Sequence, residues 1–205
     1  MFTMGLLLLL SFTVQSISAH QRSLSSIGGK DYLFVIGSQN EPVFVDDKSG
    51  VDFFAYTPDH KDPLNSFANG SKPIEGLEKM LKVEISAGAK KKVLALEPAF
   101  REPGHYEAAF YPTVQTTHNY RIFGNVSGVP VDLTFTCAPG GVAEGKALDN
   151  STVKISDQIT RKGLTGGFGC PESRSDVSFP EKYESNLELQ NKISQLENRA
   201  MTTNK

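Results

Sequence analysis

The sequence predicts an all-β fold: a seven-strand immunoglobulin-like sandwich, followed by an irregular disulfide-tied strap and a short terminal α-helix. Three observations lead to this class. Short apolar runs alternate with turn residues from Asp31 to Cys137. Tyr120 lies five residues past a turn at 113–115, where immunoglobulin-like sandwiches place a tyrosine whose hydroxyl bonds upstream backbone. The two cysteines flank a glycine-rich stretch, which a disulfide would hold in place.

Residues 1–19 are predicted to be a signal peptide. They carry no charged side chain, contain a leucine run from Leu6 to Leu10 and end at Ala19, where a signal peptidase can cut. The apolar run is roughly half the ~20 residues that a membrane-spanning helix needs. Cleavage is therefore favoured over a retained membrane anchor, which is the alternative. Cleavage makes His20 the first residue, and residues 20–30 are expected to form an N-terminal arm.

Seven strands are expected in the domain 31–137. In the third of them Leu81, Val83 and Ile85 face one way and the intervening polar residues face the other. This alternation recurs along the domain and predicts two sheets, each exposed to water on its outer face. The expected strands cover residues 32–37 with a continuation at 43–45, then 51–56, 81–87, 93–96, 106–110, 120–124 and 131–137.

A strap and a helix complete the expected chain. Residues 138–180 are rich in Gly, Ser, Thr and Asp, with a short strand near 153–155. A bond between Cys137 and Cys170 is expected to tie this strap down, because an even cysteine pair in an exported chain usually forms a disulfide. Three sequons, at Asn69, Asn125 and Asn150, are candidate glycosylation sites.

The segment 181–200 is predicted to be an amphipathic helix, followed by a disordered tail at 201–205. Its apolar residues recur at spacings of four, three and four. Isolated helices of this length are poorly stable in water, so the helix is expected to dock on its own domain, on a second copy or on a partner protein. The apolar stripe consists of Leu189, Ile193, Leu196 and Ala200.

Composition and motifs exclude several functions. The formal net charge is −2 and the lysines are dispersed, which disfavours nucleic-acid binding. The chain has no nucleophile elbow, phosphate-binding loop, zinc-protease motif or dinucleotide fingerprint. No catalytic residues are expected, and the protein is predicted not to be an enzyme.

The histidines suggest a copper site. An N-terminal His20 offers its α-amine and a ring nitrogen as a chelating pair, and such nitrogens suit copper(II). In the immunoglobulin order the start of the first strand, the loop with His60 and the loop with His105 lie at one pole. These three histidines can therefore converge there, unless they are unrelated surface residues. The candidate metal ligands are His20, His60, His105, Asp59 and Asp62.

The sequence gives less support to other metal-binding residues. His118 is expected at the opposite pole, beside Tyr120, and is left out of the site. A calcium site at Asp46, Asp47 and Asp52 is disfavoured, because the spacing is not that of an EF-hand loop.

Several segments resemble a group of exported immunoglobulin-like proteins that includes the YtkA-like and CopC-like domains. The resemblance implies the same fold and a place among proteins of copper handling. The matching segments are residues 32–37 (YLFVIG), 40–42 (NEP), 50–52 (GVD), 73–77 (PIEGL), 103–106 (PGHY) and 178–182 (SFPEK).

Two functions follow as expectations for an exported protein in an extracellular or periplasmic-type space. The first is an interaction module that docks on another exported or membrane protein, or on itself, through its C-terminal helix. The alternative is a copper(II)-binding protein that uses His20. Membrane association is expected only through a retained N-terminal segment or a membrane-protein partner.

Overall fold

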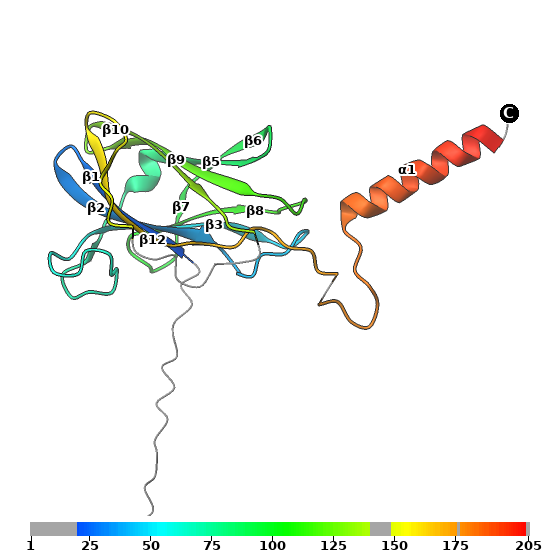
Figure 1. Cartoon of the computed structure of the whole chain (residues 1–205), viewed down its shortest axis with the longest axis horizontal. Coiled ribbons are helices and arrows are strands. Elements are labelled where there is room, and N and C mark those ends of the chain that lie inside the picture. Colours follow the sequence, from blue (N-terminus) through cyan, green and yellow to red (C-terminus); the bar gives the residue numbers. More distant parts are fainter. Residues whose placement is uncertain (1–19, 140–148, 176, 204–205) are drawn as a thin grey trace, which may run out of the picture.

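Two antiparallel β-sheets form the body of the protein, and a long helix follows them (Figure 1). The structure is a computed structural model that describes residues 20–139, 149–175 and 177–203. The predicted signal peptide at 1–19 lies outside the described residues. The all-β class, with two packed sheets and one C-terminal helix, is confirmed.

The larger sheet has the strand order β11-β12-β1-β2-β3-β8-β7, with β4 beside β3, and the smaller has the order β10-β9-β5-β6. The larger sheet contains β11 (Val153–Lys154), β12 (Ile159–Gly166), β1 (His20–Ile27), β2 (Lys30–Ser38), β3 (Ser49–Thr57), β4 (Lys72–Pro73), β7 (Glu97–Pro98) and β8 (His105–Phe110). The smaller sheet contains β5 (Leu81–Ala87), β6 (Lys90–Ala95), β9 (His118–Val126) and β10 (Val129–Thr136). The 3-10 turn η1 (Leu77–Lys79) precedes β5.

The order of the central strands is that of an immunoglobulin-like sandwich. Strands β2, β3, β8 and β7 take the places of A, B, E and D, and β10, β9 and β5 take those of G, F and C. Strands β1 and β12 widen the larger sheet beyond β2. The predicted arm at 20–30 is therefore a strand of the sheet, and the predicted strap supplies two more, β11 and β12.

Strand β1 owes its place to a tight hairpin with β2. Gly28 and Gly29 both have positive φ angles, 57° and 78°, and a two-residue loop with this backbone joins antiparallel strands without splaying them. The inward positions of β1 include Ser23 and Ser25, which are buried and lie with their hydroxyls 3.4 Å apart. A strand with a polar inner face has no apolar alternation, so the pattern in the sequence does not reveal it.

The core lies between the sheets, where every second residue of each strand points inward. Phe53 of β3 packs against Phe34 and Tyr106, with ring centroids 5.4 and 6.0 Å away. All three side chains are almost fully buried. Burial of such a side chain contributes roughly 1.5–3 kcal/mol, so this aromatic row is a main source of stability.

The outer face of the larger sheet is partly covered, so the expectation of two wet outer faces is wrong for this sheet. Leu33 and Val35 point outward from β2, yet they are 0% and 5% exposed. The loop between β3 and β4 packs over this side. Its Leu64 side chain lies over Gly163 of β12, so close that a β-carbon on Gly163 would be 3.5 Å from Leu64 Cδ1. Part of this face is therefore a dry environment.

The disulfide between Cys137 and Cys170 is confirmed. It joins the residue after β10, in the smaller sheet, to the segment that follows β12 of the larger sheet. Backbone bonds from Ala138 N–H to Phe168 C=O (2.8 Å) and from Cys170 N–H to Ala138 C=O (3.1 Å) support the link. The strap is thus tied to the sandwich by covalent and backbone bonds.

Tyr120 is buried, as predicted, but its hydroxyl bonds a side chain and not the backbone. Its partner is the Ser38 hydroxyl at 2.8 Å, and its ring stacks on Phe168 with centroids 5.0 Å apart. Tyr106 does bond backbone: its hydroxyl donates to Ile74 C=O (2.6 Å) and accepts from Leu77 N–H (3.2 Å).

Helix α1 (Asn186–Thr203) begins five residues after its predicted start and includes part of the predicted tail. Ser185 explains the start: its backbone N–H and its hydroxyl donate to Glu188, and its hydroxyl accepts from the Glu188 N–H. This reciprocal capping box satisfies the first backbone donors. The helix projects away from the sandwich and has no buried residue (Figure 1). Within the described residues, no helix has both the length and the apolar character needed to span a membrane.

Candidate metal site

The candidate site lies on the outer face of the larger sheet, where one rung crosses four strands. His20 of β1 is opposite Gly37 of β2, Gly37 is opposite Asp52 of β3, and Asp52 is opposite Glu107 of β8. Residues opposite each other point to the same side of a sheet. Because Gly37 has no side chain, the His20 ring can reach across β2 to the Asp52 carboxylate.

Both imidazole rings converge on that carboxylate. His20 Nε2 lies 2.8 Å from Asp52 Oδ2, and His105 Nε2 bonds Asp52 Oδ1. The other ring nitrogen of His105, Nδ1, lies 2.6 Å from Glu102 Oε2. Glu107 Oε1 lies 3.9 Å from His105 Nε2. The cluster therefore combines two imidazoles with one central and two flanking carboxylates.

Phe54 fixes the two rings. It is directly opposite His105 in the β3–β8 pairing, and their rings stack with centroids 4.0 Å apart and planes inclined by 16°. The His20 ring meets Phe54 edge-on, with centroids 5.8 Å apart. An apolar ring between the histidines limits their rotation, so their nitrogens stay directed at Asp52.

The charges of the cluster support one another. Burial raises the pKa of Asp52, but the hydrogen bonds from His105 and His20 outweigh burial and hold that pKa at about 2. Burial lowers the pKa of His105, whereas its bonds to Asp52 and Glu102 raise that pKa above its ordinary value. His105 is 8% exposed, and opposite charges interact strongly in such a partly desolvated place.

A further carboxylate lies near the cluster. Glu41 accepts a 3.2 Å hydrogen bond from Ser38 N–H, and its charge interacts with those of His20 and Asp52. Burial raises its pKa more than the backbone donors and His20 lower it. Glu41 therefore lies close enough to His20 and Asp52 to interact with their charges.

The structure brings together two of the three predicted histidines, His20 and His105, and does not bring the other predicted ligands to them. Asp59 Oδ1 accepts from the N–H groups of Lys61 and Asp62 at 2.7 and 2.9 Å. Asp62 in turn accepts from an Asn65 amide. These carboxylates bond the backbone and side chains of their own loop, which explains why they are not directed at the cluster.

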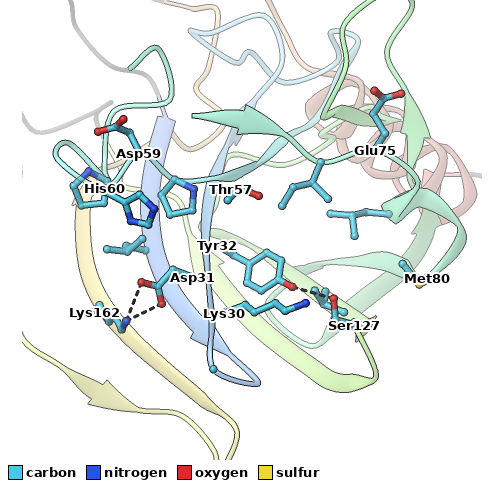
Figure 2. Close-up of a pocket in the computed structure, with 17 residues that line it drawn as sticks. Lys30, Asp31, Tyr32, Thr57, Asp59, His60, Glu75, Met80, Ser127 and Lys162 are labelled. Atoms are coloured by element: carbon cyan, nitrogen blue, oxygen red, sulfur yellow. Dashed lines mark hydrogen bonds and ion pairs between the residues drawn. The ribbon is translucent and has the colours of Figure 1, made fainter. Parts of the chain in front are cut away.

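His60 lies in a different hollow of about 700 Å³. Figure 2 shows it with Asp59 at one side of this hollow, above the ion pair of Lys162 and Asp31. Asp52 lies in the middle of β3 and His60 follows the end of that strand. At ~3.3 Å per residue, the five steps from Asp52 to the strand end alone span roughly 16 Å.

His118, excluded from the predicted site, lies outside the cluster. It begins β9 in the smaller sheet, is buried, and places Nδ1 2.9 Å from Thr116 C=O. Its backbone N–H lies 3.1 Å from Cys137 Sγ. These contacts give it a structural role.

Sequence reasoning missed Glu102 and Glu107, and it considered Asp52 only for a disfavoured calcium site. One signal was present for Asp52, which interrupts the apolar run 51–56 at a position that alternation places outside the core. A second was the His105-x-Glu107 spacing, which puts both side chains on one face of a strand. The prediction did not include the register between β1, β2 and β3. This register is what places His20 and Asp52 on one rung of the sheet.

The donor set fits a transition metal. One ligand atom each from Asp52, His105 and Glu107 lies within 4.8 Å of the other two, among the described residues. Imidazole nitrogens with carboxylate oxygens suit copper(II) and zinc, whereas calcium prefers oxygen alone. The Glu102 bond to His105 Nδ1 is the kind of outer contact that orients a metal-binding imidazole.

The predicted sequons lie at the surface or near it. Asn69 and Asn150 are exposed, and Asn125 is partly buried, with its Oδ1 accepting the Gly128 N–H at 2.8 Å. Their use as glycosylation sites stays a prediction.

Comparison of the chain with family models, curated proteins and solved structures finds no match. The resemblance to YtkA-like and CopC-like domains therefore stays a prediction, and the functional argument depends on the geometry of the cluster.

Proposed function

We propose that the protein is an exported copper(II)-binding protein whose site is the cluster of His20, His105 and Asp52. The observation that carries the proposal is the convergence of two imidazole Nε2 atoms on the two oxygens of one carboxylate. The disulfide is compatible with export, since such bonds persist in oxidising compartments. The protein carries or buffers the metal and performs no catalysis.

Cleavage after Ala19 adds a donor to this set. His20 then contributes its α-amine as well as its ring. The α-amine and the ring Nδ1 can chelate one ion, whereas the ring Nε2 is the atom that faces Asp52. His105 supplies the second imidazole, and Asp52 supplies an oxygen that neutralises charge. Copper(II) prefers a tetragonal arrangement of nitrogen and oxygen donors, which is the kind of donor set these residues would offer.

The test is a copper(II) titration of the chain that begins at His20, followed by calorimetry and electron paramagnetic resonance. We expect one equivalent of copper(II) to bind, and we expect its resonance spectrum to show hyperfine structure from nitrogen ligands. His20→Ala, or one extra residue ahead of His20, should weaken binding strongly. Glu102→Gln, which alters only the outer contact of His105, should weaken binding by about 10–100-fold.

His60→Ala is the matched control, because His60 was a candidate ligand that the structure places elsewhere. It should leave the affinity unchanged. Equal and weak copper uptake by the parent chain and by the extended chain would rule out the site. A tight preference for zinc over copper would instead show a different resident metal.

A second candidate function is an interaction module that docks through α1. The exposed apolar side chains of this helix favour it, because Leu189, Ile193 and Leu196 are 43%, 55% and 62% exposed. Both functions can reside in one chain, since the cluster and the helix share no residue.

A further inference from the structure

Helix α1 presents an apolar seam that the rest of the described chain leaves open. Its spacing of four, three and four assigns Leu189 and Leu196 to heptad position d and Ile193 and Ala200 to position a. The helix has no buried residue and projects from the sandwich (Figure 1). An 18-residue helix is marginal in water without a partner for its apolar side.

We propose that this seam pairs with the same seam of a second copy, and that the two helices form a parallel, in-register two-stranded coiled coil. This inference specifies the partner for the interaction-module function and does not depend on the copper site. A failure of copper binding would leave it standing, and a monomeric chain would leave the copper proposal standing.

The seam residues indicate two strands. A β-branched residue at a, here Ile193, together with leucine at d, here Leu189 and Leu196, favours parallel dimers over trimers and tetramers. Asn186 occupies the preceding a position, but its side chain bonds Asp46 of its own chain, so the pairing rests on Leu189, Ile193 and Leu196.

The charges beside the seam select the parallel orientation. Lys192 and Arg199 occupy g positions, and Glu197 occupies an e position. In a parallel pair, g of one helix faces e of the next heptad in the other, so each Lys192 meets a Glu197 of the opposite copy. In an antiparallel pair, g faces g, which would place Lys192 against Arg199 or against another Lys192.

The base of the helix is held so that the seam has a defined starting point. Asp46 Oδ2 accepts the Asn186 N–H and the Tyr183 hydroxyl, both at 2.8 Å. Lys192 Nζ also bonds Glu184 Oε1 ahead of the helix. That pair is exposed, so it can coexist with or yield to the contact with Glu197 of the second copy.

The first test compares two leucines of one helix by sedimentation equilibrium of the full chain. Leu189 and Leu187 are 43% and 45% exposed, but only Leu189 lies on the seam, since Leu187 is at position b. We expect a monomer–dimer equilibrium that Leu189→Lys abolishes and Leu187→Lys leaves unchanged. A parent chain that stays monomeric up to its solubility limit, or equal effects of the two substitutions, would overturn the proposal.

The second test separates the orientations by charge reversal. Lys192→Glu and Glu197→Lys should each weaken the dimer by about tenfold or more, and an equimolar mixture of the two variants should recover the affinity. Glu184→Gln controls for loss of the bond ahead of the helix and should change nothing. A tighter dimer with Lys192→Glu would show an antiparallel pair, because the introduced carboxylate would then face Arg199.

The third test traps the register. Both native cysteines are joined to each other, so a new cysteine reports only on contacts between copies. Ala200→Cys places the thiol at position a, where it faces its own counterpart in the parallel pair, and mild oxidation should give a covalent dimer. Asn198→Cys, on the outer f position, should stay unlinked. Equal cross-linking at both positions would contradict the seam.

Discussion

The two sheets of the sandwich differ in how far their outer faces are exposed to water. On the smaller sheet, β10 alternates buried and exposed residues along its length, and Arg121 and Asp132 form an ion pair on the exposed side. On the larger sheet, Leu33 and Val35 are buried on the outer side too. One sheet is an ordinary half-exposed layer, and the other is partly covered on its outer side by a loop.

This difference accounts for the position of the candidate site. A carboxylate and two imidazoles on a fully wet face would be screened by water and held loosely. Beside buried apolar side chains they interact more strongly, and Phe54 orients both rings. The ion pair of Arg121 and Asp132 on the smaller sheet is exposed, so water and salt screen its attraction.

The largest effect is expected at the covalent link between the sheets. Replacing Cys137 and Cys170 together by serine opens a loop whose ends are 33 residues apart, and chain entropy alone assigns about 3–4 kcal/mol to such a loop. Urea denaturation should show a loss of this size. An unchanged midpoint would mean that backbone pairing around Ala138 holds the sheets without the disulfide.

A matched pair of valines tests the difference between the faces directly. Val35 on the outer side of the larger sheet is 5% exposed, and Val93 of β6 is 50% exposed. Val35→Ala should cost about 1.5–3 kcal/mol through lost burial and a cavity, whereas Val93→Ala should stay within about 0.5 kcal/mol. Similar losses at both sites in thermal denaturation would show that the two faces are equally covered.

The two buried tyrosines sharpen the comparison further. Tyr106→Phe removes a hydroxyl that serves two backbone groups near η1, and it should cost about 1–3 kcal/mol. Tyr120→Phe removes one bond, to the Ser38 hydroxyl, and should cost about 0.5–1.5 kcal/mol. Equilibrium unfolding of the two variants measures the order, and the reverse order would assign the corner role to Tyr120.

The sequence was sufficient for most of the sandwich and for half of the site. Strands such as β5 and β10 alternate apolar and polar residues, so their periodicity identifies them. Strand β1 buries serines and offers only Gly28-Gly29 as a hairpin signal. The convergence of His20 and His105 followed from fold topology, but Asp52 enters the site through strand register, which depends on long-range pairing that no local pattern encodes.

The smallest expected effect is the pH dependence of the metal-free site, because part of the cluster is open to water and screened. The pKa of Asp52 falls from 3.8 to about 2 in the folded chain, so its contribution is present above pH 3.8 and is lost as pH falls toward 2. The pKa of His105 is raised above 6.5, so its contribution is present below pH 6.5 and declines as pH rises through the folded value. The stability difference between the parent chain and Asp52→Asn should therefore be greatest between pH 3.8 and 6.5. Chemical denaturation across this range, without metal, measures it, and a difference that is independent of pH would show that the histidines and Asp52 are not coupled in the folded chain.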